Sequence, residues 1–190
     1  MAWPTSLQVA LKEWSVVCDA LRDGKQTILL RKGGIYESSG EFEVEHREFL
    51  LFPTYVHQNA AMLKPDAQAW LEKRDAEPSE VALHTAAVVS DVVQLRSRIQ
   101  MDALDAEHIW TPPLIDMRFN YRPENPLYLL IVRAYRLHVP AKIPNTPAYA
   151  GCKSWVPLDH PIEIGDNIAV LDEVRFEHRR KTILERLGSR

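Results

Sequence analysis

The residues with the clearest chemical potential lie beside the first glycine pair of the chain. Arg31 and Lys32 follow the apolar run at residues 27–30 and precede Gly33 and Gly34. Glycine lets backbone N–H groups approach an anion closely, and two adjacent cations supply charge-assisted hydrogen bonds. We therefore interpret Arg31 and Lys32 as candidates for binding a phosphate or carboxylate. The spacing is not that of a phosphate-binding P-loop, and a hairpin turn with solvated charges is the alternative.

A second candidate is an acidic run in which charged and apolar residues alternate. In a strand, the carboxylates of Glu41, Glu43 and Glu45 would share one face. Such a face could bind a divalent metal, with His46 or His57 as an additional ligand. A metal-dependent nuclease or hydrolase using Glu43, Glu45 and His46 is therefore one alternative function. An exposed acidic edge strand explains the same alternation without a metal.

Other residues could hydrogen-bond to a ligand or stack on it. His57 and Gln58 follow an apolar strand, and strand ends commonly deliver polar groups into clefts. Trp110 and Trp155 lie in segments that we expect to be irregular, and exposed indole faces stack on nucleobases. These four residues are candidate ligand contacts.

Two further groups could form the wall of a pocket. Cys152, Lys153 and Trp155 bring a thiol and an ammonium close to an indole. A structural loop anchored by the packed Trp155 is the alternative. Arg133 and Tyr135 share one face of a predicted strand, where they could line a cleft or be buried for structural reasons.

These residues must be positioned by a mixed set of elements. The sequence predicts helices over residues 6–21, 58–76, 101–109 and 172–188, and strands over residues 27–30, 35–53, 81–95 and 127–137. The prolines at positions 112 and 113 are expected to end the third helix. A long proline-rich loop is expected over residues 139–157, and such loops often bind ligands. Because helices and strands do not alternate strictly, an α+β fold is favoured.

The composition limits the classes of function. The chain has 190 residues, 46% of them hydrophobic and 26% charged, which is typical of a single globular domain over residues 1–190. A net charge of −3 argues against non-specific duplex binding, although it leaves room for a local basic patch. The scattered histidines and two distant cysteines lack metal-site spacing, so we expect no cofactor. Without a secretory signal or a long apolar run, a cytoplasmic protein with no membrane partner is expected.

Several segments carry a family resemblance. Residues 10–14, 29–35, 45–54 and 151–155 resemble a bacterial family of domains of unknown function, number 1802. The resemblance covers nearly the whole chain and implies no established activity.

A more distant resemblance is to the ASCH domains of the PUA-like superfamily. Their motif GxKxxExR is similar to the stretch from Gly24 to Arg31, although Gln26 replaces its lysine and Leu29 its glutamate. The resemblance implies a small mixed β-barrel decorated with N-terminal, middle and C-terminal helices. It also implies a cleft for RNA, a modified nucleobase or a nucleoside. The two departures remove the groups that amidohydrolase members would use.

The preferred hypothesis is therefore a PUA-like domain that binds a nucleotide, a modified nucleobase or an RNA element. The expected ligand contacts are Arg31, Lys32, His57, Gln58, Trp110, Arg133, Lys153 and Trp155. A protein-interaction module that uses the loop at residues 139–157 is a third hypothesis.

Overall fold

A computed structural model describes residues 4–32, 45–151, 153–165 and 167–188. Within these residues, seven strands form one sheet in the order β2-β5-β4-β3-β1-β6, with β7 paired to β5. The strands are β1 Ser6–Trp14, β2 Ile28–Lys32, β3 Glu48–Thr54, β4 Glu80–Leu95, β5 Leu127–Pro144, β6 Trp155–Glu163 and β7 Asn167–Ala169. The helices are α1 Ser15–Arg22, α2 Pro65–Gln68, α3 Arg98–Asp102, α4 Pro112–Asn120 and α5 Glu173–Gly188. The predicted α+β class is confirmed.

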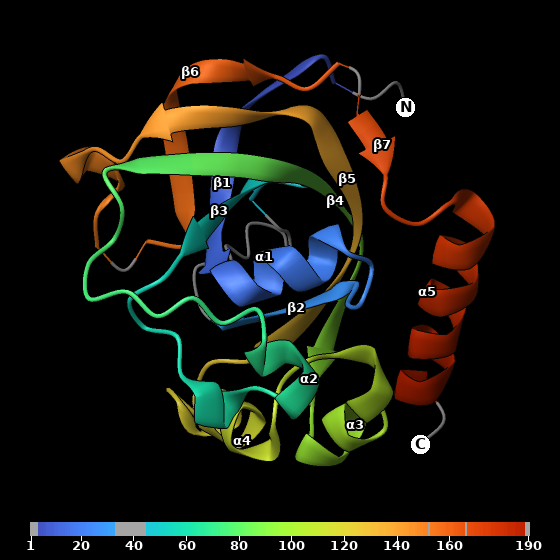
Figure 1. The fold of residues 1–190 in the computed structure, drawn as a ribbon. Coiled ribbons are helices and arrows are strands. Elements are labelled where there is room, and N and C mark those ends of the chain that lie inside the picture. The colour runs from blue at the N-terminus through green and yellow to red at the C-terminus, as the bar shows by residue number, and fades with distance from the viewer. Residues whose placement is uncertain (1–3, 33–44, 152, 166, 189–190) are drawn as a thin grey trace.

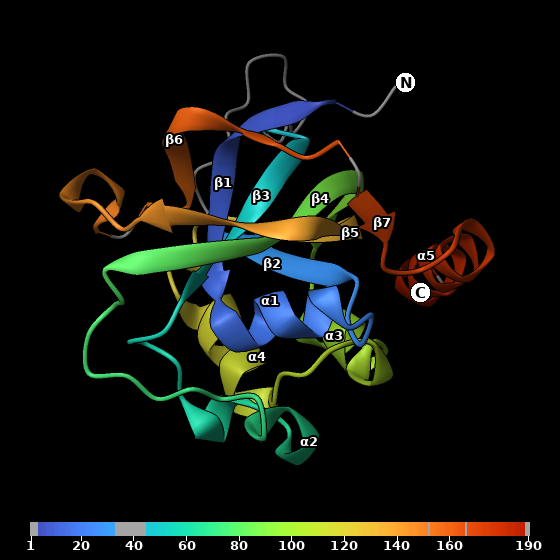
Figure 2. The same ribbon diagram turned by 45° about the horizontal axis from the view of Figure 1, so that its top comes forward.

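The sheet is strongly curved, and α1 lies inside the curve (Figures 1 and 2). This helix contacts β1, β3, β4 and β5. The strands β4 and β5 form the longest pairing, which is interrupted by two register shifts. Such bulges bend a strand and increase its twist. Strands β2 and β6 stand at the two ends of the order, and no pairing between them occurs within the described residues.

The smaller helices and α5 decorate the outside of the sheet. Figure 1 shows α2, α3 and α4 gathered near one end of it, with α5 beside β5. None of the helices in the described part of the chain has the length and apolar character needed to cross a bilayer.

The N-terminal helix predicted over residues 6–21 is wrong in its first half. Residues up to Trp14 form β1, a central strand paired in parallel with β3 and antiparallel with β6. Both faces of β1 are buried, since Leu11 belongs to the core beneath α1 and Ala10 to a second core under β6. A strand buried on both faces lacks the polar alternation that identifies most strands. Its apolar spacing therefore resembled that of a helix.

The long loop predicted over residues 139–157 is also wrong. β5 continues to Pro144 and β6 begins at Trp155, so the segment between these strands is much shorter. Pro140 lies within the register shift where β5 departs from β4 near His84. Proline is tolerated at a bulge because no ladder hydrogen bond is required there.

Prolines start a helix where the sequence had predicted only an end. Pro112 occupies the first turn of α4, where its missing N–H costs nothing. The helix predicted over residues 101–109 is divided into α3 and a 3-10 turn, Asp105–Glu107. The region predicted as a helix over residues 58–76 contains only a 3-10 turn, Ala60–Met62, and the single turn of α2.

Candidate functional site

A buried ion pair joins β1 to β2. The side chains of Glu13 and Arg31 are only 7% and 12% exposed, and Glu13 Oε2 lies 2.7 Å from Arg31 Nη1. Arg31 Nη2 also donates to the carbonyl oxygen of Lys12 at 3.1 Å. Buried charges are tolerated when they are paired and hydrogen-bonded. Arg31, predicted as a ligand contact, is thus held inside the protein.

A second arginine faces the same carboxylate. Burial lowers the pKa of the Arg118 guanidinium in α4 from its ordinary value, Glu13 opposes this shift, and Arg31 adds to it. The Nε atoms of both arginines are buried and have no hydrogen-bond partner within the described residues. We call Glu13, Arg31 and Arg118 the Glu13 cluster. Its two cations and one carboxylate carry a net charge of one positive unit, counted over the described residues.

Lys32 lines an open groove next to this cluster. Its Nζ donates to the carbonyl oxygens of Arg118 at 3.1 Å and Phe119 at 2.7 Å. The groove has a volume of about 540 Å³. Its wall is formed by Lys32, Gln94, Leu95, Arg96, Phe119, Pro123, Glu124, Asn125, Pro126 and Leu127. We call this surface the Lys32 groove.

The Lys32 groove carries more positive than negative charge. Both acceptors of the Lys32 ammonium among the described residues are neutral carbonyls, which do not cancel its charge. Arg96 is exposed, and within the described part of the chain its side chain forms no ion pair or hydrogen bond. Glu124 is the single carboxylate among the lining residues, and the half-buried ring of Phe119 adds an aromatic surface. Such a groove can attract a phosphate and stack a planar group.

The predicted hydrogen-bonding residues lie away from this groove. His57 is exposed. Gln58 is used by the fold, because its Oε1 accepts from Ser15 Oγ at 3.1 Å and from Val16 N at 3.0 Å. It thereby caps the first turn of α1, whose early N–H groups have no partner within the helix.

Trp110 is a core residue. It is 3% exposed, and its ring stacks on His108 with 5.4 Å between the centroids. Residues Leu63 and Trp110 form a β-bridge that seats this segment against the core. Burial lowers the pKa of His108 to about 4. The structure therefore gives Trp110 no open face for the stacking that its predicted irregular setting suggested.

The remaining predicted contacts are dispersed. Arg133 pairs with Glu173 of α5 and lies 5.5 Å from the ring centroids of Tyr135 and Phe176. Lys153 is exposed. The half-buried Trp155 packs edgewise on Phe49, with a centroid distance of 5.2 Å. None of these three residues lines the Lys32 groove.

The metal alternative falls partly on residues that the structure does not describe, namely Glu41 and Glu43. The glycine pair after Lys32, part of the predicted anion site, is likewise outside the described residues. Cys152 also lies outside the described residues. His46 Nε2 lies 3.6 Å from Glu45 Oε1. Across the described ranges, no three His, Cys, Asp or Glu side chains gather closely enough to hold a metal ion.

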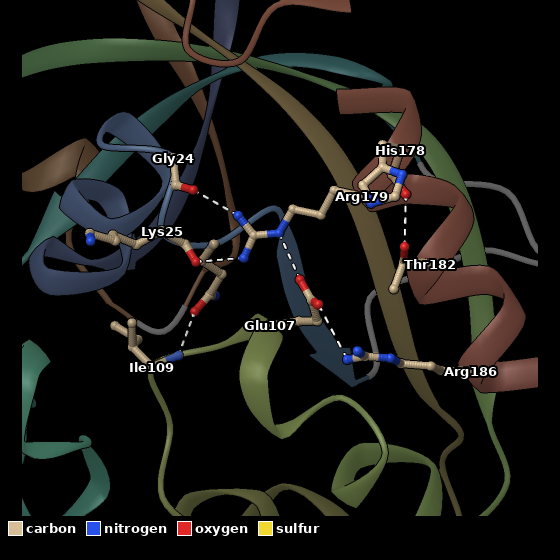
Figure 3. Close-up of polar contacts among 9 residues, drawn as sticks. Gly24, Lys25, Glu107, Ile109, His178, Arg179, Thr182 and Arg186 are labelled. Atoms are coloured by element: carbon tan, nitrogen blue, oxygen red, sulfur yellow. Dashed lines mark hydrogen bonds and ion pairs between the residues drawn. The ribbon is translucent and has the colours of Figure 1, made fainter. Parts of the chain in front are cut away.

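A different set of charges fastens α5 to the rest of the fold (Figure 3). Arg179 donates from Nε to Glu107 Oε2 at 2.7 Å. Its two terminal nitrogens donate to the carbonyl oxygens of Gly24 at 2.7 Å and Lys25 at 2.6 Å. Arg186 Nη1 reaches the other oxygen of Glu107 at 3.3 Å. We call Glu107, Arg179 and Arg186 the α5 clamp.

Sequence reasoning missed Glu13, Arg96, Arg118 and Phe119. Glu13 falls within the helix predicted over residues 6–21, whereas β1 carries it into the interior. Arg118 and Phe119 lie in α4, a helix that the sequence did not predict. Two charged residues, Lys12 and Glu13, lie between Leu11 and Val16, so the local sequence did not single out the buried carboxylate.

Comparison with known proteins gives a family and a set of similar structures. A family model described as "Domain of unknown function (DUF1802)" matches residues 10–182. A comparison with curated proteins gives no significant match. The crystal structure of ASCH from Zymomonas mobilis is 11% identical, covers 90% of this chain and 93% of its own, and has a TM-score of 0.44. A point mutant of that protein is 12% identical over 91% of this chain and 96% of its own, with the same TM-score. The predicted resemblance to the family of unknown function is thus confirmed.

Proposed function

Because the chain belongs to this DUF1802 family of unknown function, we propose a function from its own side chains. The protein binds a nucleotide, a modified nucleobase or an RNA element in the Lys32 groove. The anionic part of the ligand lies near Lys32 and Arg96, and a base stacks on Phe119.

The observation that carries this proposal is uncompensated positive charge at one place in a chain whose net charge is −3. Lys32 donates to neutral carbonyls, and Arg96 is unpaired within the described residues. The Glu13 cluster next to the groove adds a further positive charge. Opposite charges attract over about 8–10 Å in physiological salt, so these groups act together on an incoming phosphate.

The individual contacts have different roles. The Lys32 ammonium has three donors and uses two of them on Arg118 and Phe119, so one is left for a ligand. Arg96 can present its planar fork to a phosphate in a bidentate manner. Stacking of a base on Phe119 would contribute about 1–3 kcal/mol.

The test is binding of a fluorescein-labelled single-stranded RNA, followed by anisotropy over a range of salt concentrations. Arg96→Ala removes an exposed side chain, so folding is preserved, and we expect affinity to fall by roughly three- to tenfold. The slope of log K against log salt should shrink by about 0.7 for one lost phosphate contact. Lys142→Ala, which removes an exposed lysine from β5, is the matched control and should change neither quantity.

Competition then separates the ligand classes. Unlabelled adenosine monophosphate that displaces the RNA identifies a nucleotide-sized site, whereas failure to displace it indicates that a longer RNA element is required. Equal affinity and equal salt slope for Arg96→Ala and the unaltered protein would remove the Lys32 groove from consideration.

A further inference from the structure

We propose that a second pocket, separate from the Lys32 groove, binds an uncharged, planar heterocycle that carries an amino group, such as the base of adenosine or cytidine. The pocket has a volume of about 270 Å³. It lies between α1, the end of β3, the first half of β4 and the segment containing Trp70. We call it the Trp70 pocket. It shares no lining residue with the Lys32 groove.

The charged groups of the Trp70 pocket are already paired. Asp19 Oδ1 lies 2.9 Å from Arg22 Nη2. Glu72 Oε1 lies 2.6 Å from Arg74 Nη2. The Arg22 guanidinium is shared, since its Nε also lies 3.5 Å from Asp23 Oδ1. The pocket therefore offers no surplus positive charge to attract an anion, and its carboxylates can accept hydrogen bonds from an uncharged ligand.

Several neutral polar groups of the pocket remain available. The His84 ring, the Tyr55 hydroxyl and the Trp70 indole N–H have no hydrogen-bond partner within the described residues. Burial lowers the pKa of His84, so at neutral pH its uncharged ring offers one donor and one acceptor. The Asp19 carboxylate acts electrostatically on His84 and keeps acceptor capacity beyond its bond to Arg22. The pocket thus presents donors and acceptors side by side.

The size and walls of the pocket favour one aromatic ring system. Pockets for drug-sized ligands usually measure about 300–1,000 Å³, so a volume of about 270 Å³ suits a nucleobase or a small nucleoside. The half-buried indole of Trp70 packs on the core from one side and offers a stacking surface. An amino group on the ring matches the Asp19 carboxylate, which can only accept hydrogen bonds.

A metal ion is the competing occupant, because Asp19, Glu72 and His84 all line the pocket. Their side chains do not form a group of three that could coordinate one ion, according to the geometry of the described residues. The arginines bound to both carboxylates also compete with a cation.

The experiment measures binding of adenosine and of purine riboside, which lacks the amino group, to the full chain by isothermal titration and by quenching of tryptophan fluorescence. We expect adenosine to bind at least about tenfold more tightly than purine riboside, because only adenosine can donate a charge-assisted hydrogen bond from its amino group to the Asp19 carboxylate. Asp19→Asn should reduce this preference. Trp70→Ala should weaken both ligands by about tenfold or more.

The controls keep this site apart from the Lys32 groove. Lys73→Ala alters an exposed neighbour of Trp70 that does not line the pocket, and Arg96→Ala alters the groove; neither should change adenosine binding to the pocket. If Trp70→Ala unfolds, His84→Ala provides the same test with a smaller change. Absence of adenosine and cytidine binding at millimolar concentration overturns the proposal. Equal binding by the unaltered protein, Trp70→Ala and His84→Ala would do so as well.

Discussion

The Glu13 cluster and the α5 clamp are built from the same groups, one buried glutamate and two arginines, yet they differ in how their donors are used. In the clamp, all three guanidinium nitrogens of Arg179 donate hydrogen bonds, one to Glu107 and two to backbone carbonyls. In the cluster, the Nε atoms of Arg31 and Arg118 are buried and find no hydrogen-bond partner in the part of the chain that the structure describes. The two groups therefore contain the same residue types but differ in how completely their arginine donors are hydrogen-bonded.

This difference indicates which region serves the fold and which can serve a ligand. A fully hydrogen-bonded buried network rigidifies the structure around it. Buried donors without partners are uncommon in proteins, and they are costly until something accepts their hydrogen bonds. We therefore assign the clamp to docking of α5, and the cluster to the neighbourhood of the proposed site.

The largest expected effect is at the clamp. Arg179→Met should destabilise the protein by about 3–5 kcal/mol, because it leaves Glu107 and two carbonyl oxygens poorly paired. Chemical denaturation measures this loss. Arg175→Met, on the exposed side of the same helix, is the control and should change the free energy of unfolding by no more than about 0.5 kcal/mol. A loss below about 1 kcal/mol for Arg179→Met would contradict the role of the clamp in docking α5.

The clamp side of the molecule should also be sensitive to acid, because His108 follows Glu107. Its pKa is about 4 in the folded protein and near 6.5 when unfolded. Between these values the unfolded state binds more protons, so stability should fall as pH decreases from 6.5 to 4, by about 3 kcal/mol from this residue. Denaturation at several pH values tests this, and His108→Gln should flatten the dependence over that window.

A smaller loss of stability is expected at Gly24, which follows α1 and accepts a hydrogen bond from Arg179 of the clamp. Gly24 adopts a φ of 70°, and a Cβ at this position would lie 3.1 Å from Leu171 Cδ2. Gly24→Ala should therefore cost about 1–2 kcal/mol, measured as a decrease in Tm. Gly165→Ser should lower the free energy of unfolding by less, because Gly165 has open space around it and no left-handed φ.

The smallest stability effect is expected in the cluster. Arg118→Met replaces a guanidinium whose buried Nε has no hydrogen-bond partner within the described residues by an apolar chain of similar length, so the free energy of unfolding should change by less than about 1 kcal/mol. RNA binding should weaken in the same variant because positive charge next to the Lys32 groove is lost. A large destabilisation would show that Arg118 supports the fold as Arg179 does.

The elements with a strong local pattern were predictable from the sequence. β4, the first part of β5, and α5 with Asp172 at its N-terminus agree with prediction, and Asp172 Oδ1 accepts from Arg175 N at 2.8 Å. The strand β1 was not predictable, because burial of both faces erased its alternation. The helix α4 was missed because prolines that end one helix can equally start another.

The candidate site was predictable only in part. Arg31 and Lys32 were identified because they follow a buried strand and precede glycines. Their partners Glu13 and Arg118 are distant along the chain, and only the sheet order brings β1, β2 and α4 together. Trp110, the predicted stacking residue, is buried because its segment forms a β-bridge with Leu63.

The pairing of β1 with β6 has a consequence for synthesis of the chain. β1 leaves the ribosome long before its antiparallel neighbour, which comes from residues 155–163. Until these residues emerge, one edge of the nascent β1 has no partner strand, and exposed strand edges promote association between chains. Production of this protein should therefore depend on chaperones that shield the N-terminal third during translation.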